Sequence, residues 1–145
     1  MRWDFQTAPA PRKLLWTGRI LSSLAVLFLL WDSVIKLIPL TPVAEAFTRL
    51  GYPVRLAPGI GILELVCVAL YVIPATSVPG AIVLTGFLGG AIASHVRVGD
   101  PLLTHVFFPL YVALLLWGGL LLRDDGLRAF TKRSMGAPAA ARPHR

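Results

Sequence analysis

The chain has 145 residues, of which 56% are hydrophobic and 14% are charged, and its formal net charge is +7. A soluble domain averages about 45–50% apolar and about 25% charged residues, so this composition predicts a membrane protein. The single cysteine excludes a disulfide-stapled secreted scaffold and a dithiol redox centre, because each needs at least two cysteines.

Four apolar stretches are long enough for a bilayer crossing, which needs roughly 20 helical residues. They are residues 14–38, 57–73, 78–96 and 102–122. We expect each to be a helix, because an open strand edge would leave backbone groups unpaired in lipid, at a cost of several kcal/mol each. The predicted fold class is therefore all-α, a four-helix transmembrane bundle over residues 14–123.

A short helix is predicted between the first two crossings. Pro42 is typical of a first helical position, and Gly51 is typical of a helix end. Val43 and Phe47 share one face of the intervening segment. We therefore expect residues 42–50 to form an interfacial helix that lies on the membrane surface.

Residues 1–13 and 124–145 flank the membrane domain as an N-terminal segment and a basic C-terminal tail, and we expect the tail to be disordered. Four of the 14 lysines and arginines fall on the side of the bundle opposite the termini, and the others fall on the side of the termini. The positive-inside rule then places both termini in the cytoplasm. The spans divide the basic residues between two sides, so we exclude nucleic acid as a partner and expect the lipid bilayer.

Ionisable residues gather in the outer half of the predicted bundle, whereas the inner half has Arg19. An ionisable group within a span costs several kcal/mol unless it is paired or hydrated, so each one suggests a function. The asymmetry predicts a polar cavity between the helices that opens to the non-cytoplasmic side. The candidate ligand-site residues are Asp32, Lys36, Glu64, His95, Arg97, Asp100 and His105, and we expect no metal site.

Glu64 is the strongest of these candidates. It is surrounded by leucine, isoleucine and valine, and it has no cation three or four residues away on its own helix. It must therefore be protonated or meet a partner from another helix. The available partners are Lys36, Arg97, His95 and His105.

The other candidates also have purely structural interpretations. Asp32 and Lys36 are spaced to form an i,i+4 pair, as are Glu45 and Arg49 on the short helix. Asp100 precedes Pro101 and suits a helix N-cap. Arg97 suits an interfacial anchor, and a histidine near a helix end can form hydrogen bonds in the interface.

Gly86 and Gly90 place small residues on one face of the third crossing at GxxxG-like spacing, which lets another helix approach closely. A homodimer through this face and close contact within the bundle both explain the pattern.

Several short motifs, in this order and spacing, resemble those of the DoxX-like family of small four-helix bacterial membrane proteins. They are Gly18-Arg19-Ile20-Leu21, Lys36, Leu50-Gly51-Tyr52-Pro53, Gly61-Ile62-Leu63-Glu64-Leu65 and His95-Val96-Arg97-Val98-Gly99-Asp100. The resemblance implies a multi-pass protein of the bacterial cytoplasmic (inner) membrane. Founding relatives are described as subunits of a thiosulfate:quinone oxidoreductase, which implies a soluble or membrane redox partner.

Our leading hypothesis is a membrane subunit of a redox-linked complex, with an outward-facing polar cavity for a small molecule, a quinone being the candidate. Glu64 would hold or exchange a proton, a histidine would hydrogen-bond the ligand, and Lys36 or Arg97 would tune the charge. We expect no covalently bound cofactor, so a partner would supply electrons, and whether the chain itself is an enzyme stays open. The alternatives are a proton-coupled transporter of small solutes and a non-catalytic membrane scaffold.

Overall fold

In the computed structural model, which describes residues 11–38 and 40–136, the long elements are all helices. Four of the described segments are long and apolar enough to cross a membrane: Arg12–Leu37, Val54–Val72, Pro74–Arg97 and Leu102–Arg123. A short helix lies between the first two of them. The predicted fold class, all-α with four such helices and a short one after the first, is confirmed.

The elements follow each other in a simple order. They are α1 (Arg12–Leu37), α2 (Thr41–Arg49), the 3₁₀ turn η1 (Val54–Leu56), α3 (Ala57–Val72), the 3₁₀ turn η2 (Pro74–Thr76), α4 (Ser77–Arg97), the π-helical turn η3 (Leu102–Val106), α5 (Phe108–Arg123) and α6 (Asp125–Gly136). The second and third crossings begin a few residues earlier than the sequence predicts. The reason is that η1 and η2 extend them with turns whose hydrogen bonding differs from that of an α-helix.

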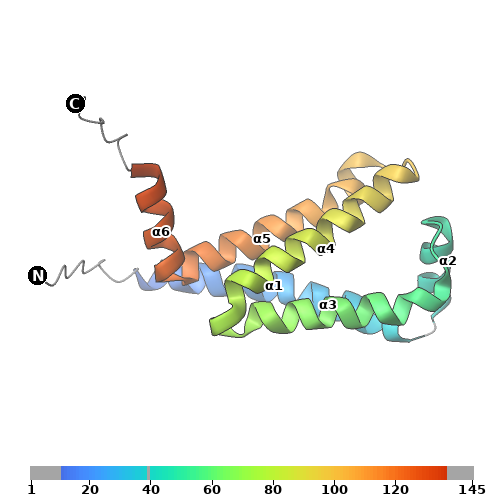
Figure 1. The fold of residues 1–145 in the computed structure, drawn as a ribbon, viewed down its shortest axis with the longest axis horizontal. Coiled ribbons are helices and arrows are strands. Elements are labelled where there is room, and N and C mark those ends of the chain that lie inside the picture. Colours follow the sequence, from blue (N-terminus) through green and yellow to red (C-terminus); the bar gives the residue numbers. More distant parts are fainter. Residues whose placement is uncertain (1–10, 39, 137–145) are drawn as a thin grey trace, which may run out of the picture.

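The four long helices are not parallel along their whole length (Figure 1). Near α6 they lie together, whereas toward the opposite end α4 and α5 diverge from α1 and α3. The short helix α2 lies at this divergent end, which we call the α2 end. The core lies where the helices meet, and it includes Leu29, Val68, Leu84 and Leu116.

Small residues allow α1 to approach its two neighbours closely. A Cβ built on Gly119 of α5 would lie 2.4 Å from the Ser22 hydroxyl oxygen, and one built on Gly61 of α3 would lie 2.8 Å from the Ser33 carbonyl oxygen. By contrast, a Cβ on Gly86 or Gly90 meets no described atom within 4 Å. Contact within the bundle therefore does not explain these two glycines, and the homodimer stays a prediction.

A buried tyrosine fastens the end of the bundle near α6. Tyr71 of α3 is 0% exposed, and its hydroxyl donates to the carbonyl oxygen of Leu116 at 2.8 Å and lies 2.9 Å from the Ser22 hydroxyl oxygen. Arg123 donates to the Tyr71 carbonyl oxygen at 3.2 Å, with its guanidinium 4.9 Å from the centre of the tyrosine ring. These contacts join α1, α3 and α5.

The structure differs from the prediction in the C-terminal tail. Residues 124–145 were expected to be disordered, but Asp125–Gly136 form helix α6. The Asp124 carboxylate accepts a hydrogen bond from the amide of Leu127 at 2.8 Å, and Leu127 packs against the core. The N-terminal cap at Asp124 and the packing of Leu127 thus favour a helix, which the basic composition of the segment does not predict. The expectations for residues 1–10 and 137–145 lie outside the described residues.

Candidate functional site

A cavity of about 330 Å³ lies at the divergent end of the bundle. We call it the central cavity, and its volume falls in the range of small-molecule sites, roughly 300–1,000 Å³. Side chains from α1 to α5 and the turn after α2 line it. The acidic and basic residues of the lining are Asp32, Lys36, Arg49, Glu64 and His95.

Three of these side chains form one charged cluster. The Lys36 ammonium donates to Glu64 Oε2 at 2.8 Å and also to the Asp32 carboxylate. Glu64 is 0% exposed, whereas the Asp32 side chain is 29% exposed. Lys36 is therefore the partner that Glu64 needs from another helix.

Gly61 explains how Lys36 reaches Glu64. Gly61 precedes Glu64 by three residues, so both lie on the same face of α3. A Cβ at position 61 would lie 3.0 Å from the Lys36 Cβ. Because Gly61 has no side chain, α1 approaches α3 closely enough for the Lys36 ammonium to contact the buried carboxylate.

The second oxygen of Glu64 has a different environment. Oε1 is buried and has no hydrogen-bond partner among the described residues. An unpaired buried polar atom costs about 1–3 kcal/mol, and more when it is charged. Oε1 is therefore a buried polar atom of the cavity lining whose hydrogen-bonding capacity the described residues leave unused.

Several aromatic side chains contribute to the walls of the central cavity. Phe28 of α1 and Phe108 of α5 make an edge-to-face contact with 5.0 Å between ring centres. Phe87 of α4 lies with its ring centre 5.9 Å from the Lys36 ammonium nitrogen, and Phe47 of α2 contacts Tyr52. All five aromatic residues line the cavity, so an apolar planar ligand has surfaces to pack against.

Asp100 lies between His95 and Arg49. Its two carboxylate oxygens lie 2.5 Å from His95 Nδ1 and 2.7 Å from Arg49 Nη1. The hydrogen bond with His95 and the charge of Arg49 lower the pKa of Asp100 below its ordinary value, against the opposing effect of burial.

This arrangement corrects two structural interpretations. Asp100 is not the N-cap of the next helical segment, because Pro101 holds that position and no side-chain cap bond forms. Arg49 pairs with Asp100, although its spacing favours an i,i+4 pair with Glu45. Arg49 is a site residue that the sequence did not reveal, because a contact 51 positions away leaves no local pattern.

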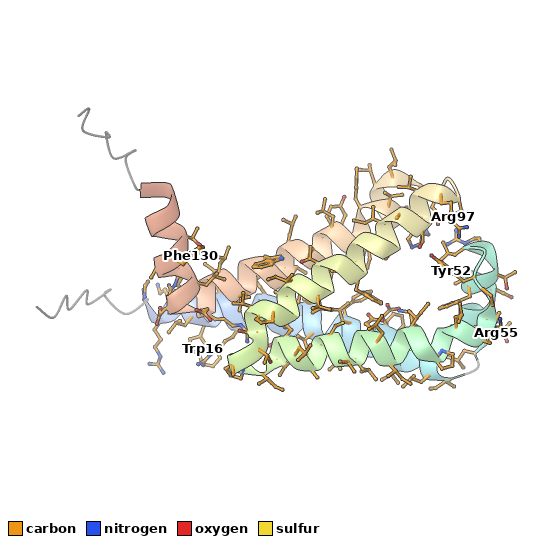
Figure 2. All side chains as sticks on the ribbon, viewed as in Figure 1. Trp16, Tyr52, Arg55, Arg97 and Phe130 are labelled. Carbon is orange, nitrogen blue, oxygen red and sulfur yellow. The ribbon has the colours of Figure 1, made fainter. Side chains whose placement is uncertain are left out.

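Arg97 joins the C-terminal end of α4 to the turn after α2. Figure 2 shows Arg97 and Tyr52 facing each other at the α2 end, and the guanidinium carbon lies 5.5 Å from the tyrosine ring centre. Arg97 also donates to the Leu50 carbonyl oxygen, and the Tyr52 hydroxyl lies 2.8 Å from Ser94 Oγ. Gly51 permits this turn, because its φ of +72° disfavours residues with a side chain.

His105 contacts His95 but does not line the central cavity. The two imidazole rings are 5.8 Å apart, and His105 Nδ1 lies 2.9 Å from the Thr104 hydroxyl oxygen. The helix is interrupted here, because η3 ends at Val106 and α5 begins only at Phe108, with Pro109 in its first turn. Proline lacks the amide hydrogen that would continue the hydrogen-bond ladder.

The structure thus brings together part of the predicted set. Asp32, Lys36, Glu64 and His95 line the central cavity, and Asp100 contacts it through His95. Arg97 and His105 lie outside the lining. The sequence analysis did not identify the phenylalanines and Tyr52 as cavity residues. Nothing in the sequence distinguishes them from the other aromatic residues of this apolar chain.

Comparison with known proteins agrees with this membrane fold. The model of the DoxX-like family matches residues 20–119, a stretch that includes every residue lining the central cavity. No curated protein and no solved structure matches the chain.

Proposed function

Because the chain belongs to the DoxX-like family and is a multi-pass membrane protein with four candidate spans, we propose that it is a membrane subunit whose central cavity binds a small molecule of the quinone class. In this proposal the α2 end faces the non-cytoplasmic side of a bacterial inner membrane. A partner protein supplies the electrons, because the ionisable side chains of the cavity transfer protons and not electrons.

The observation that carries the proposal is the free oxygen of Glu64. Oε1 is buried, unpaired among the described residues, and part of a residue that lines the cavity. As a carboxylate it accepts a hydrogen bond from the hydroxyl of a hydroquinone. As a carboxylic acid it donates one to the carbonyl of a quinone. One residue therefore suits both redox forms of this class and can carry one of the two protons by which they differ, while the partner protein supplies the two electrons.

The other cavity residues support the same class. His95 lines the cavity and is held by Asp100, so its ring has a fixed orientation toward a polar ligand group. Lys36 keeps a positive charge beside Glu64, and the partly exposed Asp32 connects this pair with the outside for proton exchange. The phenylalanines would contact the faces of a flat ring.

Transport of a solute across the membrane is less well supported. It requires a second opening near α6, where Tyr71 is fully buried and hydrogen-bonded to α1 and α5. We therefore favour a cavity that opens at one end of the bundle.

The test is a binding titration of the purified protein in lipid nanodiscs with a tail-less benzoquinone and with its hydroquinone. We expect saturable binding of both, and we expect Glu64→Gln to weaken hydroquinone binding by at least about tenfold, which corresponds to 1.4 kcal/mol. Glu45→Gln is the matched control, because Glu45 is exposed on α2 and does not line the cavity. Unsaturable binding to the unmodified protein, or an unchanged affinity in Glu64→Gln, would overturn the proposal.

A further inference from the structure

We infer that the ligand of the central cavity carries a long apolar tail, and that this tail lies beneath α2 and leaves the protein between α1 and the start of α3. The inference rests on the proposed function and narrows the ligand to a lipid-tailed member of its class. It follows from two further hollows that adjoin the central cavity.

The three hollows meet at Lys36. A hollow of about 160 Å³ between α1 and α2, the lateral hollow, shares Asp32, Lys36, Ala46 and Phe47 with the central cavity. A third hollow of about 430 Å³, the outer hollow, shares Lys36 and Val43 with the lateral one. The three hollows are therefore neighbours and form a series from the centre of the bundle to its surface.

The chemistry of the lining changes along this series. The central cavity contains the charged cluster around Glu64, whereas the outer hollow is walled mainly by aliphatic side chains from the end of α1, the start of α2 and η1. Leu37, Ile38, Leu40 and Val54 of this wall are each 38–47% exposed. In a membrane protein such side chains face acyl chains. A polar head group would therefore contact the charged cluster of the central cavity, and an apolar tail would contact the aliphatic walls of the outer hollow.

The position of the two hollows next to the central cavity argues for the tail of the same ligand and against an unrelated phospholipid. A phospholipid bound in the outer hollow would not occupy the lateral hollow, so its binding would not explain why the two hollows adjoin. A tail attached to a head group beside Glu64 can run beneath α2 through the lateral hollow, which adjoins the central cavity at Asp32, Lys36, Ala46 and Phe47.

The position of the tail can be mapped by photolabelling. The probe is a benzoquinone with a saturated alkyl tail that carries a diazirine, irradiated with the full-length protein in nanodiscs and followed by peptide mass spectrometry. We expect labels concentrated in residues 37–44 and 54–58, and we expect excess tail-less benzoquinone to remove them. Labels spread over lipid-facing positions such as Leu63 and Leu114 would overturn the inference, as would labels that the tail-less competitor leaves in place, because those would indicate an independent lipid site.

A variant separates this inference from the proposed function. Val43→Trp obstructs the junction of the lateral and outer hollows, and Val43 does not line the central cavity. We expect it to lose most of the photolabelling while its affinity for the tail-less benzoquinone stays unchanged. Leu63→Trp, at an exposed position of α3 outside all three hollows, is the control for added bulk. If tail-less binding persists but Val43→Trp labels normally, the tail path is wrong and the cavity proposal stands. If the unmodified protein binds neither compound, the proposed function itself fails.

Discussion

At the residue scale, the electrostatics of the central cavity depend on Lys36, whose ammonium group contacts the carboxylates of Asp32 and Glu64. One cation between two carboxylates leaves a net negative charge unless one carboxyl group binds a proton. Glu64 is the more deeply buried of the two, and its second oxygen has no hydrogen-bond partner in the part of the chain that the structure describes. The net charge of this cluster therefore depends on whether a carboxyl group carries a proton. A site that exchanges protons with its ligand requires such a group.

We expect Lys36→Met to lower the free energy of unfolding by about 3 kcal/mol, because removal of one partner from a buried ion pair leaves the other charge uncompensated. The double variant Lys36→Met/Glu64→Gln should recover part of this loss, since it also removes the stranded carboxylate. Steric trapping in bicelles measures both values. Lys13→Met, an exposed change on the same helix, should have little effect. A double variant no more stable than Lys36→Met alone would contradict this account.

At the element scale, α2 and the turn after it are joined to the end of α4 by contacts of side chains. Arg49 reaches Asp100, Arg97 reaches the Leu50 carbonyl oxygen, and Tyr52 reaches Ser94. Each contact joins positions more than 40 residues apart. These polar contacts restrain the position of α2 relative to α4.

The docking of α2 should depend on pH through Asp100. Contacts with His95 and Arg49 favour the ionised carboxyl, so its pKa is lowered. An acidic group with a lowered pKa stabilises the folded arrangement fully above the ordinary aspartate pKa of about 3.9. This stabilisation is lost as the pH falls through the lowered pKa. We therefore expect α2 to stay docked between neutral pH and about pH 4 and to separate from α4 in stronger acid.

Pulsed electron paramagnetic resonance between spin labels at Glu45→Cys and Val98→Cys, in a Cys67→Ala background, measures this separation. Asp100→Asn should broaden the distance distribution already at neutral pH. Separation of the unmodified helices between pH 7 and pH 5 would show that another group controls the docking.

The limits of these elements could be predicted better than their contacts. Long apolar runs and local signals such as Pro42 and Gly51 determine where helices begin and end, so the four spans and α2 were found within a few residues. The partner of Glu64 stayed one of four candidates, because the choice depends on how closely Gly61 lets α1 approach. Arg97 and His105 were placed at the correct end of the bundle, but depth alone does not tell which side chains point into a cavity.

At the scale of the whole molecule, the two ends of the bundle differ in both packing and charge. Near α6 the helices are held together around Tyr71, and this end carries Arg12, Lys13, Arg19, Arg123 and Arg128. At the α2 end the helices diverge around the central cavity (Figure 1). Two of the basic residues there, Lys36 and Arg49, are paired with carboxylates.

This asymmetry predicts how the chain is oriented. Lysine and arginine near the ends of spans are retained in the cytoplasm, and the α6 end carries the larger number of them. The central cavity should then open on the non-cytoplasmic side, and the termini should be cytoplasmic. In a Cys67→Ala background, which removes the native buried thiol, we expect Glu45→Cys on α2 to react with a membrane-impermeant maleimide in intact cells. Asp125→Cys, exposed at the start of α6, should react only after the membrane is permeabilised. The reverse pattern would place the cavity in contact with the cytoplasm, and the ligand would then have to enter from the opposite leaflet.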